Sequence, residues 1–326
     1  MKFREFSDVG WKVSEVGLGC WAIGSEWGDV SKEDATEVLK SSLDHGINFF
    51  DTADVYGDGR SERFVGELLK STNEKIYVAT KSGRRLNPHT SNGYNLNNIE
   101  SFIDRSLINL GVDCIDLLQL HCPPSDVCSK KETYEMMDEI VKKGKISYYG
   151  VSVEKVSEAM DAIQFPNVKS IQIIFNMFRQ KPAEEFFQEA AKKNVAIIAR
   201  VPLASGLLTG KMTESSSFPA NDHRNYNIKG EAFDVGETFS GVNFDKGLQA
   251  VEEIKKLIPN NFSLTDLALK WILMHQEITV AIPGAKKNHQ LSKNVNAVHL
   301  DDISSLMPLI KDVYSQYLKE DIHHRW

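Results

Sequence analysis

Short runs of β-branched and aromatic residues alternate with amphipathic segments along nearly the whole chain. This alternation is typical of βα units that build a parallel sheet. Eight runs have the length and composition of strands, at residues 13–19, 48–54, 76–81, 115–121, 146–152, 170–176, 195–201 and 279–284. Eight such strands fit a closed barrel better than an open sheet, so the pattern predicts an α/β fold of the (β/α)8 TIM-barrel type.

The segments between these strands carry the signals that start and stop helices. Apolar residues recur every three to four positions in them, which predicts helices with one buried face. Three of the helices open on a capping residue with an acidic residue three positions later: Ser31 with Asp34, Asn97 with Glu100, and Ser263 with Asp266. Gly46 and Gly111 follow the first two, where glycine commonly ends a helix. We interpret the apolar stripes as core packing.

Two segments depart from the eightfold repeat. Residues 1–12 hold the turn sequence SDVG between two short alternating runs, which predicts a β-hairpin at the floor of the barrel. After the seventh strand, residues 202–245 form a polar, Gly-rich and Asn-rich loop far longer than a usual βα loop. Such a loop is typical of a lid or binding segment, with simple surface disorder as the alternative. No shift in composition marks a linker, so we expect one domain over residues 1–326.

The composition is that of an ordinary globular protein, with 41% hydrophobic and 25% charged residues in a chain of 326. Acidic residues outnumber basic ones by 45 to 38, and the net charge of −7 argues against a nucleic-acid or membrane partner. The N-terminal residues lack the apolar stretch of a signal peptide. The cysteines are few and irregularly spaced, which favours free thiols and a cytoplasmic location: Cys20, Cys114, Cys122 and Cys128.

Polar residues stand at the ends of three consecutive predicted strands. Asp51 ends the second strand, Lys81 the third and His121 the fourth, and Tyr56 follows Asp51 by five positions. A parallel barrel has its active site at the carboxyl ends of its strands. Because the three strands are neighbours, we expect the four side chains to converge at the mouth of the barrel.

These residue types suit an acid catalyst beside a cation. A nearby ammonium on Lys81 favours the phenolate and should lower the pKa of Tyr56, while Asp51 keeps Lys81 charged. His121 is placed to hydrogen-bond a substrate oxygen. A metal site on Asp51 and His121 is the alternative, but no HxH or HExxH spacing accompanies them and a lysine disfavours a cation. We therefore predict no metal.

The segments DTADVYG, VATK, LLQLH and GVS, in this order, resemble the signature segments of the aldo-keto reductases. The similarity runs from the hairpin before GLGCW to the C-terminal IPGAKKNHQLSKNVNA. It implies a barrel that binds a nicotinamide dinucleotide, usually NADPH, in extended form without a Rossmann fold. It also implies a catalytic tetrad of Asp51, Tyr56, Lys81 and His121, which reduces the carbonyl of a small aldehyde or ketone with Tyr56 as proton donor. By resemblance we expect a monomer or weak homo-oligomer.

The resemblance also implies which residues contact the dinucleotide. Ser152 and Gln172 would hydrogen-bond the nicotinamide carboxamide, with Asn176 as support, and the loop PLASGLLTGK would wrap the pyrophosphate. The full implied set is Gly19, Cys20, Trp21, Asp51, Ser152, Gln172, Arg200, Pro202, Leu203, Ser205, Gly206, Lys211, Gly284, Lys286, Gln290 and Asn294. The stretch GLGCWAIG fails the GxGxxG spacing, so it is not a Rossmann motif.

A basic segment indicates the adenosine end independently of the resemblance. Residues 283–299 hold Lys286, Lys287 and Lys293 with no acidic residue, a local charge of +3 in a chain of −7. The first two lysines precede a predicted helix that begins near Asn288, and a helix N-terminus preceded by lysines is a ready anion site. The segment favours NADPH, with its extra 2′-phosphate, over NADH. A solvated basic helix is the alternative.

Two positions depart from the family pattern. Arg200 stands at the end of the seventh strand, where many members carry an aromatic residue that stacks on the nicotinamide. A guanidinium also stacks on planar rings but adds charge beside a ring that is cationic when oxidised, so we expect weaker binding of NADP+ than of NADPH. Val153 follows Ser152 where an asparagine is common, which removes one carboxamide hydrogen bond.

Two other functions compete with carbonyl reduction. One is an NADP(H)-binding redox sensor or scaffold with little turnover, as the barrel subunits associated with potassium channels suggest by resemblance. The other is a metal-dependent barrel hydrolase or isomerase. The complete tetrad argues against a purely structural role, although a fold alone does not decide function.

Overall fold

The computed structural model describes residues 1–24, 27–260 and 262–326. One parallel sheet runs in chain order through β3 (Leu18–Gly19), β4 (Phe49–Asp51), β5 (Tyr77–Ser82), β6 (Ile115–His121), β7 (Ile146–Ser152), β8 (Val168–Ile174), β9 (Ala196–Arg200) and β10 (Ile278–Ala281). The two edges of the sheet meet, because the Gly17 amide donates to the Ala281 carbonyl at 2.8 Å and the Gly19 amide to the Pro283 carbonyl at 3.1 Å. The predicted (β/α)8 barrel is confirmed.

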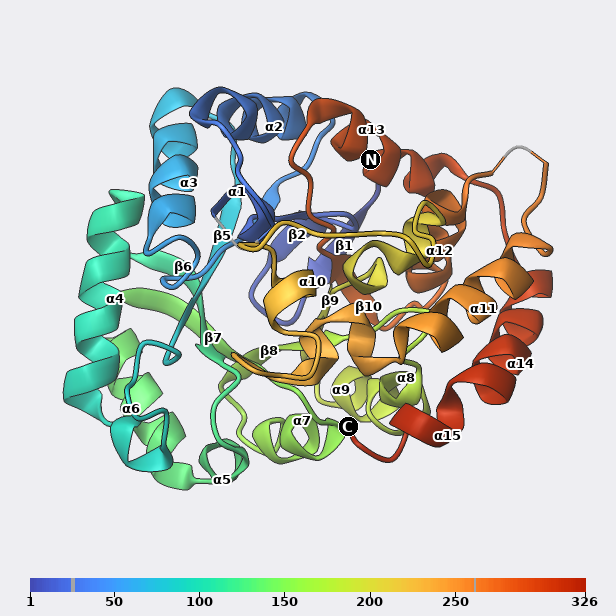
Figure 1. Ribbon diagram of the computed structural model, residues 1–326. Helices are drawn as coiled ribbons and strands as arrows, with labels where there is room; N and C mark the ends of the chain where they lie inside the picture. Colours follow the sequence, from blue (N-terminus) through green and yellow to red (C-terminus); the bar gives the residue numbers. More distant parts are fainter. Residues whose placement is uncertain (25–26, 261) are drawn as a thin grey trace.

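Helices surround the barrel on the outside (Figure 1). The α-helices are α1 (Trp21–Gly24), α2 (Lys32–Asp44), α3 (Arg60–Ser71), α4 (Leu96–Leu110), α5 (Ser125–Cys128), α6 (Lys131–Lys142), α7 (Val156–Ala162), α8 (Lys181–Glu185), α9 (Phe187–Lys192), α10 (His223–Tyr226), α11 (Phe244–Lys255), α12 (Leu264–Leu273), α13 (Asn288–Asn296), α14 (Met307–Tyr317) and α15 (Lys319–Ile322). Short 3-10 turns are η1 (Ser91–Gly93), η2 (Ala204–Thr209), η3 (Val235–Glu237), η4 (Phe239–Gly241), η5 (Ala297–His299) and η6 (Ser304–Leu306). Among the described residues, no helix is both long and apolar enough to cross a membrane.

The helix starts agree with the predicted caps at two of three positions. Ser31 Oγ accepts from the Asp34 amide at 3.0 Å to open α2, and Ser263 caps α12 in the same way. The predicted cap at Asn97 is wrong: Asn95 Oδ1 accepts from the Asn98 amide at 3.1 Å, so α4 begins two residues earlier. Both asparagines suit a cap, but the turn η1 brings the chain into the helix at Asn95.

The N-terminal hairpin closes the floor of the barrel, as predicted, but it extends to Ser14, past the predicted residues 1–12, so the first barrel strand does not begin at residue 13. Its strands β1 (Phe3–Phe6) and β2 (Trp11–Ser14) pair antiparallel. The Phe6 ring stacks on Phe49 at 5.6 Å and the Trp11 ring on Tyr77 at 4.5 Å, centroid to centroid. Phe49 and Tyr77 are the first residues of β4 and β5, so the hairpin covers the amino ends of the strands. The opposite end of the barrel is left for a site.

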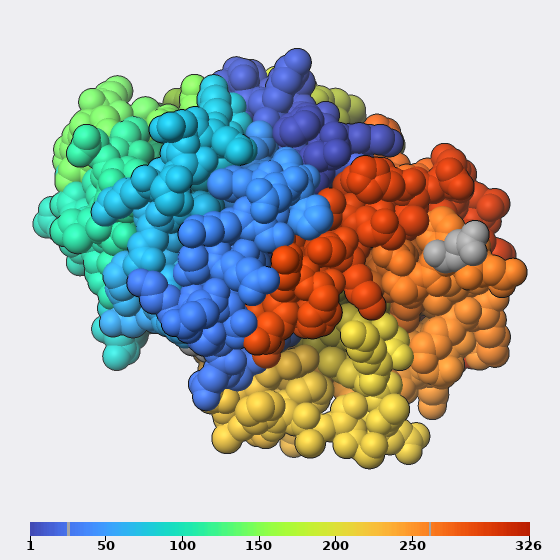
Figure 2. All heavy atoms as spheres, turned by 90° about the horizontal axis from the view of Figure 1, so that it is seen from above, coloured from blue at the N-terminus to red at the C-terminus, as the bar shows by residue number. Residues whose placement is uncertain are grey.

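The long segment 202–245 covers that opposite end. It contains η2, α10, η3 and η4, and in Figure 2 its yellow and orange atoms lie at the far side of the molecule from the dark blue hairpin. Asp222 forms an antiparallel bridge to Trp27, and the His223 ring packs against Trp21 with centroids 4.8 Å apart. These contacts tie the segment to the loop after β3 and place it over the carboxyl ends of the strands.

Candidate active site

Four polar side chains from neighbouring strands meet at the mouth of the barrel. Lys81 Nζ, on β5, donates to Asp51 Oδ1 at 2.5 Å and to the Tyr56 hydroxyl at 3.2 Å. The His121 ring, at the end of β6, lies edge-on to the Tyr56 ring with centroids 5.9 Å apart. Asp51 ends β4, and the turn that follows carries Tyr56 back over the strand ends. The structure therefore brings all four predicted residues together.

Asp51 is fixed by more than the lysine. Gln172 Nε2 donates to Asp51 Oδ2 at 2.7 Å, and Gln119 Nε2 donates to the same oxygen at 3.1 Å. Asp51 and Lys81 are both buried, and a buried ion pair is stable only when its remaining lone pairs are also hydrogen-bonded. Sequence reasoning missed Gln119. Its position two residues before His121, on the same face of β6, was the signal that would have found it.

Burial and the Asp51 carboxylate raise the pKa of Tyr56 well above its ordinary value. The expected lowering by Lys81 is therefore wrong for the protein alone, since the cost of burying a phenolate outweighs the ammonium. Tyr56 consequently holds its proton at neutral pH. Lys81 carries only donor hydrogens, so the phenol oxygen accepts from it and the Tyr56 hydrogen points elsewhere.

His121 is neutral in this environment. Burial, together with Arg84 and Lys81, holds the pKa of His121 well below its usual range. Within the described ranges its Nδ1 atom has no hydrogen-bond partner, although the side chain is only 3% exposed. A neutral imidazole has one N–H donor and one acceptor nitrogen. His121 can therefore offer a hydrogen bond to a group bound beside Tyr56.

A cavity of about 420 Å³ lies between the strand ends and segment 202–245. This volume is typical of a site for a small molecule or cofactor. Tyr56 and His121 line one part of it. All but one of the residues predicted to contact the dinucleotide also line it: Gly19, Trp21, Asp51, Ser152, Gln172, Arg200, Pro202, Leu203, Ser205, Gly206, Lys211, Gly284, Lys286, Gln290 and Asn294.

Some predicted contact residues are engaged within the protein. Cys20 is the exception to the lining set: it is fully buried, and its thiol lies 3.6 Å from the Leu18 carbonyl oxygen. Ser205 Oγ donates to the Glu237 carbonyl at 3.1 Å. Asn176 Nδ2 donates to the Val201 carbonyl at 2.8 Å, so it holds the loop instead of supporting a carboxamide. Gln172 keeps only its amide oxygen for a ligand, because its nitrogen binds Asp51.

Cations gather at a second part of the cavity. Lys286, Lys293 and Lys211 line it, and Lys286 Nζ donates to the Trp27 carbonyl at 2.6 Å. Lys287 instead pairs with Asp34 on α2 at 2.5 Å, so it does not add to this group. Sequence reasoning missed a fourth cation there.

That fourth cation is Arg224 on α10. Its guanidinium pairs with Asp222 at 2.6 Å and lies over the Trp27 ring, 4.9 Å from the centroid. Arg224 and burial together lower the pKa of Lys286, burial being the larger cause. No periodic pattern in segment 202–245 could have indicated Arg224.

Arg200 lines the cavity but is not an isolated charge. Its Nη2 atom pairs with Glu154 at 2.9 Å and donates to the Val153 carbonyl at 3.0 Å, and its Nη1 atom lies 3.8 Å from Glu237. Arg84 pairs with the same two glutamates, so Arg200 belongs to a cluster of two guanidinium groups and two carboxylates. The charge that Arg200 was expected to add beside the nicotinamide is thus paired within the protein, and weaker binding of NADP+ than of NADPH stays a prediction.

Comparison with known proteins agrees with this geometry. The model of the Aldo/keto reductase family matches residues 15–307. Aldo-keto reductase YhdN of Bacillus subtilis is 33% identical over 298 residues, which cover 89% of this chain and 87% of that protein. The NADP(+) aldo-keto reductase yakc of Schizosaccharomyces pombe is 30% identical, covering 88% of this chain and 84% of its own.

Solved structures and a channel subunit are also similar. The glycerol dehydrogenase AKR11B4 of Gluconobacter oxydans superposes with a TM-score of 0.79 at 28% identity, over 97% of this chain and 96% of that one. A "Probable voltage-gated potassium channel subunit beta" of Arabidopsis thaliana is 27% identical over 98% of this chain and 97% of its own. Because the family model and these relatives span almost the entire chain, the protein belongs to the aldo/keto reductase family.

Proposed function

We propose that this protein is an NADPH-dependent oxidoreductase that reduces the carbonyl of aldehydes or ketones to alcohols, with Tyr56 as the proton donor. One observation carries the proposal: Lys81 joins Asp51 and Tyr56 at the wall of a cavity whose other part collects cations. Membership of the aldo/keto reductase family supports it, because carbonyl reduction with NADP(H) is the general chemistry of that family.

The residues that line the cavity fit a phosphorylated dinucleotide. Lysine and arginine side chains at one part suit phosphate groups. At the other part the Ser152 hydroxyl donates to the Gln172 amide oxygen at 3.5 Å, and this oxygen has a second lone pair that suits a carboxamide. We propose that Lys286, Lys293 and Arg224 hold the phosphates of the adenosine end. Bound NADPH supplies the hydride that reduces the carbonyl carbon.

The protein's own groups supply position and a proton. The neutral His121 donates a hydrogen bond to the carbonyl oxygen, and Tyr56 turns its free hydrogen toward the same oxygen. When Tyr56 gives up that proton, the Lys81 ammonium stabilises the phenolate at the 3.2 Å contact already formed. Asp51 holds Lys81 in place during this step.

The test replaces Tyr56 by phenylalanine, which removes the hydroxyl and keeps the ring. We expect NADPH oxidation with a panel of aldehydes to fall by about 10²–10⁴-fold. The dissociation constant for NADPH, from titration of cofactor fluorescence, should stay within about twofold of the wild-type value. The reason is that the proposed role of Tyr56 is to donate a proton to the substrate and not to bind the cofactor. Tyr317→Phe on α14 is the matched control. Wild-type rates in the Tyr56→Phe variant would refute the assignment.

A scaffold or redox sensor with little turnover is the second candidate, which the similarity to the Arabidopsis channel subunit favours. It predicts tight NADP(H) binding with slow, single-turnover oxidation. Steady-state turnover with released NADP+ excludes it in favour of the reductase. Pre-steady-state and steady-state measurements on the same preparation distinguish the two.

We also propose that residues 1–326 form one domain that works in the cytoplasm as a monomer or weak homo-oligomer. The free cysteines support a reducing compartment. A single calorimetric transition and a monomeric mass by light scattering are the expected results. Two separate transitions would contradict the single domain.

A further inference from the structure

Four charged residues with largely buried side chains form a cluster beside the proposed catalytic residues. They are Arg84 after β5, Glu154 after β7, Arg200 at the end of β9, and Glu237 on η3. Their side chains are between 7% and 18% exposed. Arg84 Nη2 reaches Glu154 Oε1 at 3.3 Å and also hydrogen-bonds Glu237 Oε1. The cluster therefore holds two guanidinium groups and two carboxylates, with no net formal charge.

Glu237 differs from the other three in where it comes from. The strand ends carry Arg84, Glu154 and Arg200, whereas Glu237 belongs to segment 202–245. Arg200 and Glu237 both line the cavity. The side chain of Glu237 thus occupies, from the cavity side, a place between the guanidinium groups of Arg84 and Arg200. A pair of arginines is the arrangement that proteins use to bind a carboxylate ligand.

The backbone that carries Glu237 is held from behind by Trp326. Trp326 Nε1 donates to Asp234 Oδ1 at 3.1 Å. Its ring packs so closely on Gly236 and Gly241 that a Cβ atom would lie 3.1 Å and 2.3 Å from ring carbons. These two glycines permit the close approach; Gly236 lies within η3 and Gly241 ends η4. Trp326 therefore packs against the backbone on both sides of Glu237.

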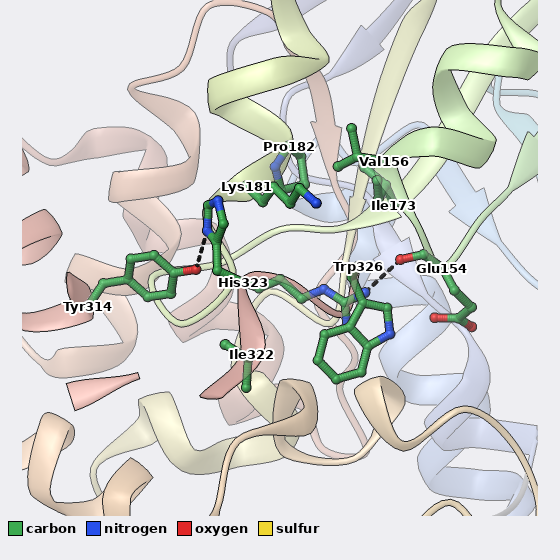
Figure 3. Close-up of a pocket in the computed structure, with 10 residues that line it drawn as sticks. Glu154, Val156, Ile173, Lys181, Pro182, Tyr314, Ile322, His323 and Trp326 are labelled. Carbon is green, nitrogen blue, oxygen red and sulfur yellow. Dashed lines mark hydrogen bonds between the residues drawn. The ribbon is translucent and has the colours of Figure 1, made fainter. Parts of the chain in front are cut away.

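Trp326 also reaches the backbone of Glu154 through Arg179. The Arg179 guanidinium stacks on its ring, 4.0 Å from the centroid, and donates to the Glu154 carbonyl oxygen at 2.6 Å. Figure 3 shows Trp326 beside Glu154. A dashed line there marks the hydrogen bond that Arg179 donates to the Glu154 carbonyl oxygen. These contacts fix the backbone at Glu154 and on both sides of Glu237.

We propose that Glu237 determines substrate specificity: its carboxylate fills the anion position between Arg84 and Arg200, so that the cavity accepts neutral carbonyl compounds and rejects those that carry a carboxylate. The proposal rests on the proposed carbonyl reduction. Without Glu237, two guanidinium groups face the single carboxylate of Glu154, and a substrate carboxylate has a place to bind. Residue 237 thus decides the charge of the substrate end of the cavity.

The experiment compares benzaldehyde with 4-carboxybenzaldehyde, which share the reacting group and differ in one charge. In Glu237→Gln, and in Glu237→Ala, we expect the ratio of kcat/KM for the carboxylate over the neutral aldehyde to rise about tenfold above wild type, chiefly through a lower KM. A purely structural role for Glu237 lowers both values together and leaves the ratio unchanged. Glu231→Gln, an exposed glutamate of the same segment, is the matched control.

A binding measurement makes the test independent of turnover. Benzoate should raise the thermal unfolding midpoint of Glu237→Ala and Glu237→Gln, and leave that of wild type and Glu231→Gln unchanged. An unchanged substrate ratio together with no effect of benzoate overturns the proposal. If wild type reduces neither aldehyde, the proposed function fails, and the benzoate arm still tests whether Glu237 fills an anion position.

Discussion

Replacing Asp51 by asparagine tests whether the buried ion pair holds the site together. Lys81 donates to Asp51 Oδ1 at 2.5 Å, while Gln172 and Gln119 donate to Oδ2 at 2.7 Å and 3.1 Å. Every neighbour of the carboxylate is thus a donor. An asparagine amide has one accepting oxygen and one donating nitrogen, so its nitrogen faces a donor whichever way it turns.

The expected loss follows from the burial of both partners. Asp51 is 2% exposed and Lys81 is fully buried, so the substitution leaves a buried ammonium without its counter-charge. Breaking a buried pair in this way costs about 3–5 kcal/mol of the free energy of unfolding. That is a large share of the roughly 5–15 kcal/mol by which folded domains are stable. NADPH oxidation should be lost as well, because Lys81 would no longer be held against Tyr56.

Equilibrium urea unfolding at pH 7, followed by circular dichroism, measures this loss. The control is Asp104→Asn, which removes an exposed partner of Lys145 and should cost no more than about 1 kcal/mol. If Asp51→Asn is as stable as this control, the ion pair does not hold the site together and the reasoning is refuted.

Two further predictions concern stability. Burial, with a smaller contribution from Glu62, raises the pKa of Asp54 to about 7. Between about pH 4 and pH 7, Asp54 is therefore protonated in the folded protein and ionised in the unfolded chain, so the free energy of unfolding falls as the pH rises. The unfolding free energy of Asp54→Asn relative to wild type should therefore increase by about 2–4 kcal/mol from pH 4 to pH 8, and a difference that is constant with pH would contradict this. Trp11→Ala should cost about 3–5 kcal/mol by opening the barrel floor. The exposed Phe3→Ala should cost about 0.5 kcal/mol or less in the same urea titration, and equal losses would show that the hairpin does not seal the barrel.

Local patterns in the chain were enough to predict most elements of the fold, but the predicted first strand, residues 13–19, is divided between the hairpin strand β2 and the two-residue barrel strand β3. Alternation, strand length and caps such as Ser31 and Ser263 act over a few neighbouring residues, so they can be read directly. Asn95 shows the limit, because two nearby asparagines satisfy the same local rule and the preceding turn selects between them.

The catalytic candidates were predictable for a related reason. In a parallel barrel, the last residue of each strand points to one common end, so Asp51, Lys81 and His121 were expected to meet before any distance was known. The resemblance of DTADVYG, VATK and LLQLH to the signature segments of the aldo-keto reductases indicated the same residues as catalytic candidates. The pairing of Asp51 with Gln172 needed the closed barrel, since the two residues are 121 positions apart.

Burial and charge pairing depend on contacts between distant segments, and the chain gives no local sign of them. Tyr56 has a raised pKa because the folded barrel removes water from it, which reversed the expectation drawn from Lys81 alone. Lys287 looked like a phosphate ligand but pairs with Asp34 across 253 residues. Glu237 lies in a segment without periodicity, and only its contacts with the two arginines and the packing of nearby glycines on Trp326 give it a place at the cavity.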